Sequence, residues 1–121
     1  MPKILCVEDN QTQQEIYARL LRDSGFEVVL ANDGAEAVEK ARSLEPDLIL
    51  MDLLMPGMDG FEAIELIRSN DDTRSIPILS ISAWASDQSK ERALAVGANE
   101  HFTKPIVFDQ LLATINQYLQ A

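Results

Sequence analysis

The chain has 121 residues, 46% of them hydrophobic and 25% charged, which is enough for one domain with a buried core and excludes a disordered chain. Its 20 acidic and 10 basic residues give a formal net charge of -10, and a field of this sign opposes binding to the phosphate backbone of nucleic acids. Because no apolar stretch approaches the roughly 18 residues of a membrane span and no signal-peptide pattern precedes the first strand, we expect one cytoplasmic domain over residues 1–121 that binds neither nucleic acid nor membranes.

Strand-like and helix-like segments alternate along the whole chain, beginning with a strand. In chain order, the expected strands and helices cover about 3–7, 11–24, 27–30, 34–43, 48–51, 61–69, 78–81, 86–96, 99–102 and 107–119. Alternation of this kind predicts repeated βαβ units around a parallel sheet.

Two segments carry the clearest local signals. The apolar residues Ile16, Leu20 and Leu21 recur at three- and four-residue spacing, which predicts the first helix, and Gly25 supplies a left-handed stop after it. The strand at 48–51 is apolar on both faces, so we expect it to be central in the sheet, with helices on each side and parallel neighbours.

Four of the expected strands end on residues suited to phosphate or metal chemistry. In chain order these residues are Glu8-Asp9, Asp52, Ser82 and Lys104-Pro105. Because parallel strands joined by helices place their carboxyl ends on one edge of the sheet, we expect these residues to share one pocket.

The types of these residues predict a particular chemistry. Three carboxylates, Glu8, Asp9 and Asp52, would repel one another by about 4 kcal/mol per pair at 4 Å and an effective dielectric constant near 20, so a cation should bind between them. Oxygen ligands without histidine or cysteine suit Mg²⁺, with Mn²⁺ as an alternative, and magnesium sites often include a phosphate. Lys104 would supply a positive charge and Ser82 a hydroxyl donor for that phosphate. Asp52 ends the most apolar strand and is the best-placed nucleophile for an aspartyl phosphate.

The strand-end residues belong to longer motifs. In order, they are Glu8-Asp9, Asp52 followed by Met55-Pro56-Gly57-Met58-Asp59-Gly60, Ser82-Ala83 and Lys104-Pro105. Together they resemble a response-regulator receiver domain, the CheY-like phosphoacceptor domain of two-component signalling, over the whole chain. We therefore expect a doubly wound (βα)5 fold, a flavodoxin-like three-layer α/β sandwich of strand order 2-1-3-4-5, with the site in the crevice between the first and third strands.

The resemblance implies how the site would hold its metal and its phosphoryl group. Asp52 would accept the phosphoryl group from a phosphohistidine of a sensor histidine kinase or a histidine phosphotransfer protein. Asp9, Asp52 and the main-chain carbonyl of Leu54 would bind Mg²⁺, and Glu8 would bind it through water. Ser82 and Lys104 would then contact the phosphoryl oxygens, and the Lys104-Pro105 peptide bond would be cis, as X-Pro bonds allow.

Other residues of the family pattern bear on switching. Ala83, Trp84, His101 and Pro105 would lie at the switch or partner face. Receivers commonly carry tyrosine or phenylalanine where this chain has His101, so this residue is either a switch that rotates inward, with a charge that depends on pH, or a simple surface residue. Trp84 either covers the helix beneath it or anchors a partner, and we expect Leu54 and Trp84 to slow hydrolysis of the phosphate.

The expected function is a phosphorylation-controlled switch rather than a turnover enzyme. By the resemblance, the face made by the fourth helix, fifth strand and fifth helix would contact a downstream protein, and the domain would be a monomer or a phosphorylation-dependent dimer. The sequence suits a stand-alone regulator as well as a receiver from a longer protein. Two alternatives stay open: a pseudo-receiver that binds partners constitutively, and a magnesium-dependent phosphohydrolase. Phosphohydrolases of the haloacid-dehalogenase type carry a second aspartate two residues after the nucleophile, where this chain has Leu54.

Overall fold

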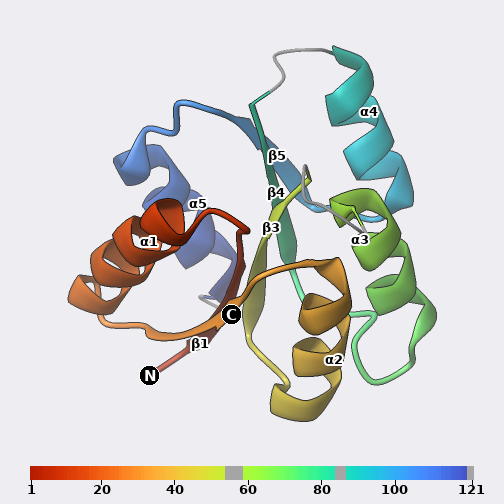
Figure 1. Ribbon diagram of the computed structural model, residues 1–121, viewed down its shortest axis with the longest axis horizontal. Helices are drawn as coiled ribbons and strands as arrows, with labels where there is room; N and C mark the ends of the chain where they lie inside the picture. The colour runs from red at the N-terminus through yellow and green to blue at the C-terminus, as the bar shows by residue number, and fades with distance from the viewer. Residues whose placement is uncertain (54–58, 84–86, 120–121) are drawn as a thin grey trace.

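The computed structural model describes residues 1–53, 59–83 and 87–119. Strands and helices alternate through these residues (Figure 1). In chain order they are β1 (Lys3–Val7), α1 (Gln11–Asp23), β2 (Glu27–Ala31), α2 (Gly34–Leu44), β3 (Leu48–Asp52), α3 (Gly60–Ser69), β4 (Ile78–Ser82), α4 (Asp87–Val96), β5 (Glu100–Thr103) and α5 (Phe108–Leu119). The strands form one parallel sheet of order β2-β1-β3-β4-β5. The predicted doubly wound α/β fold is therefore confirmed.

The sheet lies between two layers of helices, with α1 and α5 on one side and α2, α3 and α4 on the other (Figure 1). All five residues of β3 are buried, as expected for a central strand. Their side chains alternate between the two cores, because Leu48 and Leu50 face the core under α1 and α5, whereas Ile49 and Met51 face the other core. Among the described helices, none is both long enough and apolar enough to cross a bilayer.

Side-chain caps fix the start of three helices close to the carboxyl edge of the sheet. The carboxamide or carboxylate oxygens of Asn10, Asp33 and Asp59 accept hydrogen bonds from main-chain amides at 2.9, 2.8 and 2.9 Å. Each cap satisfies one of the free amides of the first helical turn. Because Asn10 caps α1, the carboxylate of the preceding Asp9 is left available to the site.

The apolar residues that predict α1 do not form its buried face. Of the three, only Leu21 is buried, while Ile16 is 47% and Leu20 37% exposed. The face that packs on the sheet consists of Gln14, Tyr17, Ala18 and Leu21. This face has the same helical spacing, so periodicity alone could not distinguish it from the exposed one, and its first member is a polar residue whose burial depends on tertiary hydrogen bonds.

Candidate functional site

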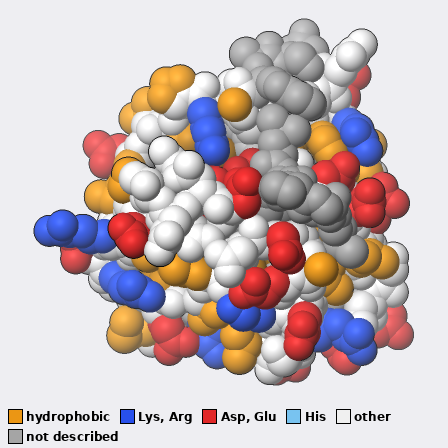
Figure 2. Space-filling view, viewed as in Figure 1, with side chains coloured by type: hydrophobic (Ala, Val, Ile, Leu, Met, Phe, Trp, Pro, Cys, Tyr) orange, Lys and Arg blue, Asp and Glu red, His pale blue; other side chains and the backbone are white. Residues whose placement is uncertain are grey.

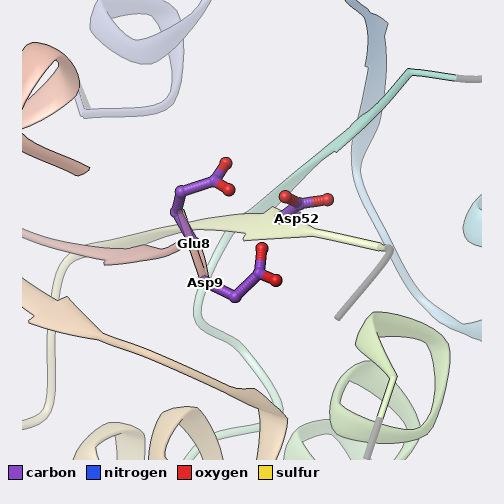
Figure 3. Close-up of side chains that lie close together, drawn as sticks. All are labelled: Glu8, Asp9 and Asp52. Carbon is purple, nitrogen blue, oxygen red and sulfur yellow. The ribbon is translucent and has the colours of Figure 1, made fainter. Parts of the chain in front are cut away.

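The acidic residues predicted from the strand ends meet in one pocket at the carboxyl edge of the sheet. Glu8 and Asp9 follow β1, and Asp52 ends β3 on the neighbouring strand. Figure 3 shows the three carboxylates turned toward a common centre, and one oxygen of each lies within 4.8 Å of the others. The Nζ atom of Lys104 lies 3.3 Å from Glu8 Oε2 and 3.5 Å from Asp52 Oδ2. The four side chains thus form one ionic cluster.

The parallel register explains why these residues meet. Val7 pairs with Met51, so the residues that follow them, Glu8 and Asp52, lie at the same level of the sheet. The main-chain amide of Glu8 donates to the carbonyl of Ala31 at 3.1 Å, which extends the pairing of β1 with β2 by one residue. The amide of Asn10 donates to Glu8 Oε1 at 3.2 Å and holds the turn into α1.

The pKa values of Glu8 and Lys104 are both raised, but burial acts in opposite directions on the two groups. Burial, followed by the hydrogen bond and the negative charge of Asp52, raises the pKa of Glu8 to about 7 from its ordinary value of 4.5. Burial opposes the charge of Lys104, but the carboxylates of Asp52 and Glu8 outweigh it and raise the pKa of that ammonium. When all four groups are ionised, the three carboxylates and the one ammonium have a net charge of -2. A set of carboxylate oxygens with this net charge fits a divalent cation such as Mg²⁺.

Negative charge is not restricted to this pocket. On the face shown in Figure 2, acidic side chains are interspersed with lysines and arginines over the surface. Within the pocket the acidic groups differ in exposure, because Glu8 and Asp52 are buried whereas Asp9 is exposed. A ligand that enters from solvent would therefore meet Asp9 first.

Ser82 occupies the end of β4, next to the acidic cluster. Asp52 pairs with Ile81 across the sheet, so Ser82 lies one residue further along the neighbouring strand, where it is fully buried. Its carbonyl accepts a hydrogen bond from the amide of Lys104 at 2.8 Å, which ties the ends of β4 and β5 together. Ala83, the next residue, is exposed. Ser82 and Lys104 are therefore held as neighbours at the edge of the site.

His101 is half-buried on β5 and turned toward β4. Its Nδ1 atom lies 2.8 Å from Ser80 Oγ, and its Nε2 atom is buried without a hydrogen-bond partner among the described residues. Because the Ser80 hydroxyl donates its hydrogen to the carbonyl of Glu100 at 3.2 Å, its oxygen is left to accept a hydrogen bond from the Nδ1–H of His101. Burial and then the charge of Lys90 lower the pKa of His101, so the neutral ring is favoured near pH 7. Ser80 was not among the predicted site residues, and the only signal for it in the sequence is a serine on an otherwise apolar strand.

Several predicted residues fall on parts of the chain that the structure leaves out. The main-chain carbonyl of Leu54, the turn residues 55–58 and the side chain of Trp84 lie outside the described residues, so their assigned roles stay predictions. The Lys104-Pro105 peptide bond is described, and it is cis as expected.

A groove that the sequence analysis missed adjoins the acidic cluster. It has a volume of about 490 Å³ and is lined by Gln13, Ile16, Tyr17, Leu20, Lys104, Pro105, Ile106 and Phe108. Lys104 lines this groove and also contacts Glu8 and Asp52, so the groove and the cluster share a wall. The exposed side chains of Ile16 and Leu20 give the groove its apolar character.

Comparison with known proteins identifies the family. The family model of the response regulator receiver domain matches residues 4–116. The polar-differentiation response regulator DivK of Brucella anthropi is 35% identical over 120 residues, which cover 98% of each chain. The receiver domain of the sensor histidine kinase PA1611 from Pseudomonas aeruginosa PAO1, whose crystal structure has a magnesium ion coordinated in the active-site cleft, matches with a TM-score of 0.92 and 33% identity over 99% of this chain and 98% of that chain. The chemotaxis protein CheY4 of Vibrio cholerae matches with a TM-score of 0.91 and 35% identity over 98% of both chains. The chain belongs to the response regulator receiver domain family of two-component signalling.

Proposed function

We propose that this receiver domain is a phosphorylation switch in which Asp52 accepts a phosphoryl group from a phosphohistidine of a sensor histidine kinase or a histidine phosphotransfer protein. The observation that carries the proposal is the convergence of three carboxylates and Lys104 at the carboxyl edge of the sheet. A carboxylate that ends a buried central strand beside a lysine is placed to act as a nucleophile toward phosphorus. The domain is a signalling module, and its slow loss of phosphate would reset the switch.

The proposed transfer is a single displacement. A carboxylate oxygen of Asp52 attacks the phosphorus atom, the bond between phosphorus and the histidine nitrogen breaks, and that nitrogen keeps the electron pair. Lys104 would stabilise the negative charge of the phosphoryl oxygens, and the Ser82 hydroxyl would donate to one of them. Such a loose transition state needs mainly positioning and charge stabilisation.

The residues of the pocket fit a bound Mg²⁺. Asp9 and Asp52 would bind it directly with the carbonyl of Leu54, and Glu8 would bind it through water. When bound, the ion would neutralise charge on the phosphoryl oxygens. The structural support is the all-oxygen donor set of Glu8, Asp9 and Asp52.

Intact mass after incubation with acetyl phosphate and Mg²⁺ tests this function. We expect the mass of one phosphoryl group to be added, and we expect it to disappear in Asp52→Ala and in a sample without magnesium. If no adduct forms, the measurement is repeated with a phosphorylated kinase, because some receivers do not react with small donors. Failure with both donors would contradict the proposal and favour a constitutive pseudo-receiver. Sustained turnover of a phosphate ester would instead favour a phosphohydrolase.

The groove beside Lys104 is the proposed docking surface for the protein that donates the phosphoryl group. A donor protein must bring its phosphohistidine to Asp52, and Lys104 links that carboxylate directly to the groove. Exposed apolar side chains next to a reaction site indicate a protein interface. The exposed residues Ile16, Leu20 and Val107 lie on or beside the elements that line it.

Replacing Ile16 by glutamine should separate the two kinds of phosphoryl donor. Loss of one apolar contact of about 1.4 kcal/mol would weaken docking about tenfold, so phosphotransfer from a limiting concentration of phosphorylated kinase should slow by about that factor. Phosphorylation by acetyl phosphate should stay the same, because that donor needs no groove. Leu66→Gln is the matched control, since Leu66 is 45% exposed on α3, on the other side of the sheet. Equal slowing in both variants would contradict the assignment.

The output of the switch would use a different surface. We propose that phosphorylation changes the affinity of the face formed by α4, β5 and α5 for a downstream protein or for a second copy of the chain. His101 and the exposed Leu94 belong to this face. The contact of His101 with Ser80 on β4 connects the face to the strand that ends at Ser82.

A further inference from the structure

Gln14 is a buried polar residue on the face of α1 that packs against the sheet. It is 6% exposed, and its neighbours on that face include Tyr17 and Leu21. Its amide nitrogen Nε2 donates to the main-chain carbonyl of Glu8 and to Asn32 Oδ1, the latter at 2.7 Å. Both hydrogens of the amide are therefore directed at acceptors, which also fixes the orientation of the amide.

These two hydrogen bonds hold the chain at the point where it enters the acidic pocket. The carbonyl of Glu8 is held by Gln14, and the amide of Glu8 is held by the carbonyl of Ala31 at 3.1 Å. Asn32 is itself anchored, because its Nδ2 donates to Glu36 Oε2 at 3.2 Å. A continuous set of polar contacts thus runs from the main chain of Glu8 to the first turn of α2.

A buried amide at position 14 needs hydrogen-bond acceptors such as the Glu8 carbonyl and Asn32 Oδ1. An amide transferred from water to an apolar environment without hydrogen bonds costs about 1–3 kcal/mol by mutational measurements, whereas an apolar side chain would pack there without that cost. The hydrogen bonds of Gln14 orient the main chain at Glu8. Glu8 and Asp9 are successive residues, and the carboxylates of both face Asp52 (Figure 3).

We propose that Gln14 is a positioning residue of the acidic site, which fixes the Glu8-Asp9 turn so that its carboxylates are ready to bind Mg²⁺. This inference rests on the proposed function, because it concerns the metal affinity of the same pocket. Gln14 does not contact the cation. It acts through the main chain of Glu8, and the expected effect is taken from partners that orient metal ligands, whose removal typically changes metal affinity by about 10- to 100-fold.

The test compares Gln14→Met with the wild-type chain. Methionine has a similar length and no donor, so the dissociation constant for Mg²⁺, measured by isothermal titration calorimetry, should rise at least about tenfold. Amide hydrogen exchange in the metal-free protein should become faster at Asn10, whose amide donates to the Glu8 carboxylate. Gln117→Met, at an exposed position of α5, is the control and should change neither quantity.

The possible results are distinguishable. If Gln14 has only a structural role, Gln14→Met will unfold at a lower temperature while the folded protein binds Mg²⁺ within twofold of wild type, and the inference is then wrong. If wild type itself binds no Mg²⁺, the metal part of the proposed function fails, and this inference fails with it. Should Gln14→Met not fold, Asn32→Ala takes its place. Asn32 is exposed, and loss of its oxygen leaves Gln14 with one acceptor, so Mg²⁺ should bind at least about threefold more weakly; unchanged binding in this variant would also overturn the inference.

Discussion

Replacing Gly60 by alanine should lower the free energy of unfolding by about 3 kcal/mol and slow phosphorylation of Asp52 by acetyl phosphate. A Cβ atom at position 60 would lie 2.5 Å from the carbonyl oxygen of Asp52 and 2.6 Å from the Cα atom of Leu53. Both neighbours are main-chain atoms at the end of β3, so no side chain can move aside to make room. Either α3 moves away from the sheet, or the main chain that carries the phosphoacceptor shifts. Chemical denaturation and the rate of mass gain with acetyl phosphate measure the two effects.

Gly25→Ala provides a matched control for this substitution. Gly25 has a φ of +95°, so alanine is strained there, but a Cβ atom would meet nothing within 4 Å. We expect the strained backbone conformation to lower the free energy of unfolding by about 1–2 kcal/mol, and we expect the rate of phosphorylation to be unchanged. If Gly60→Ala were phosphorylated as fast as Gly25→Ala, close packing of α3 on β3 would have no part in positioning Asp52.

The metal-free protein should become less stable as the pH rises from about 4.5 to beyond 7, through the contribution of Glu8. The folded-state pKa of Glu8 is raised to about 7, so this group stabilises the fold fully below its unfolded pKa, and its contribution is lost as the pH rises through the folded pKa. The difference from the ordinary value of 4.5 corresponds to about 3 kcal/mol at 1.36 kcal/mol per pKa unit. Saturating Mg²⁺ should remove this loss, because a bound cation favours the ionised carboxylate.

Glu8→Gln isolates this effect from other titrations. His101 acts in the opposite direction, since its lowered pKa makes the fold less stable as the pH falls. The difference in free energy of unfolding between wild type and Glu8→Gln, measured with urea from pH 4.5 to 8 in EDTA, cancels the contribution of His101. The expected result is a difference that changes by about 2–3 kcal/mol over this range. A flat difference would show that Glu8 ionises in the folded protein as it does in the unfolded chain.

Which residues gather at the acidic pocket could be predicted from a local pattern. Glu8 and Asp52 come directly after or at the end of an apolar strand, Lys104 comes directly after β5, and parallel topology brings such strand ends to one edge. Helix signals were equally local, so the boundaries of most elements lie within a residue or two of those expected. The boundaries that shifted, such as β5 at Glu100–Thr103 instead of 99–102, depend on hydrogen bonds to a neighbouring strand.

Side-chain contacts between distant segments were not predictable in this way. Arg68 donates to the carbonyls of Gly97 and Ile76 at 2.9 and 2.7 Å and to Asn99 Oδ1 at 2.9 Å. No feature of the sequence around Arg68 distinguishes it from a solvated arginine at the end of a helix. The pairing exists because α3, the end of α4 and the start of β4 are brought together by the fold.

The sequence by itself determined the order of strands and helices, the central place of β3 and the group of residues at the carboxyl edge, because periodicity and strand-end chemistry are properties of short segments. Only the tertiary structure decided which face of α1 is buried, how Gln14 holds the Glu8 turn, and that His101 lies against Ser80. It also decided that Lys104 contacts both Glu8 and Asp52 while lining a groove with Ile16. These features depend on the distances between segments far apart in the chain, and such distances are set when the whole core packs.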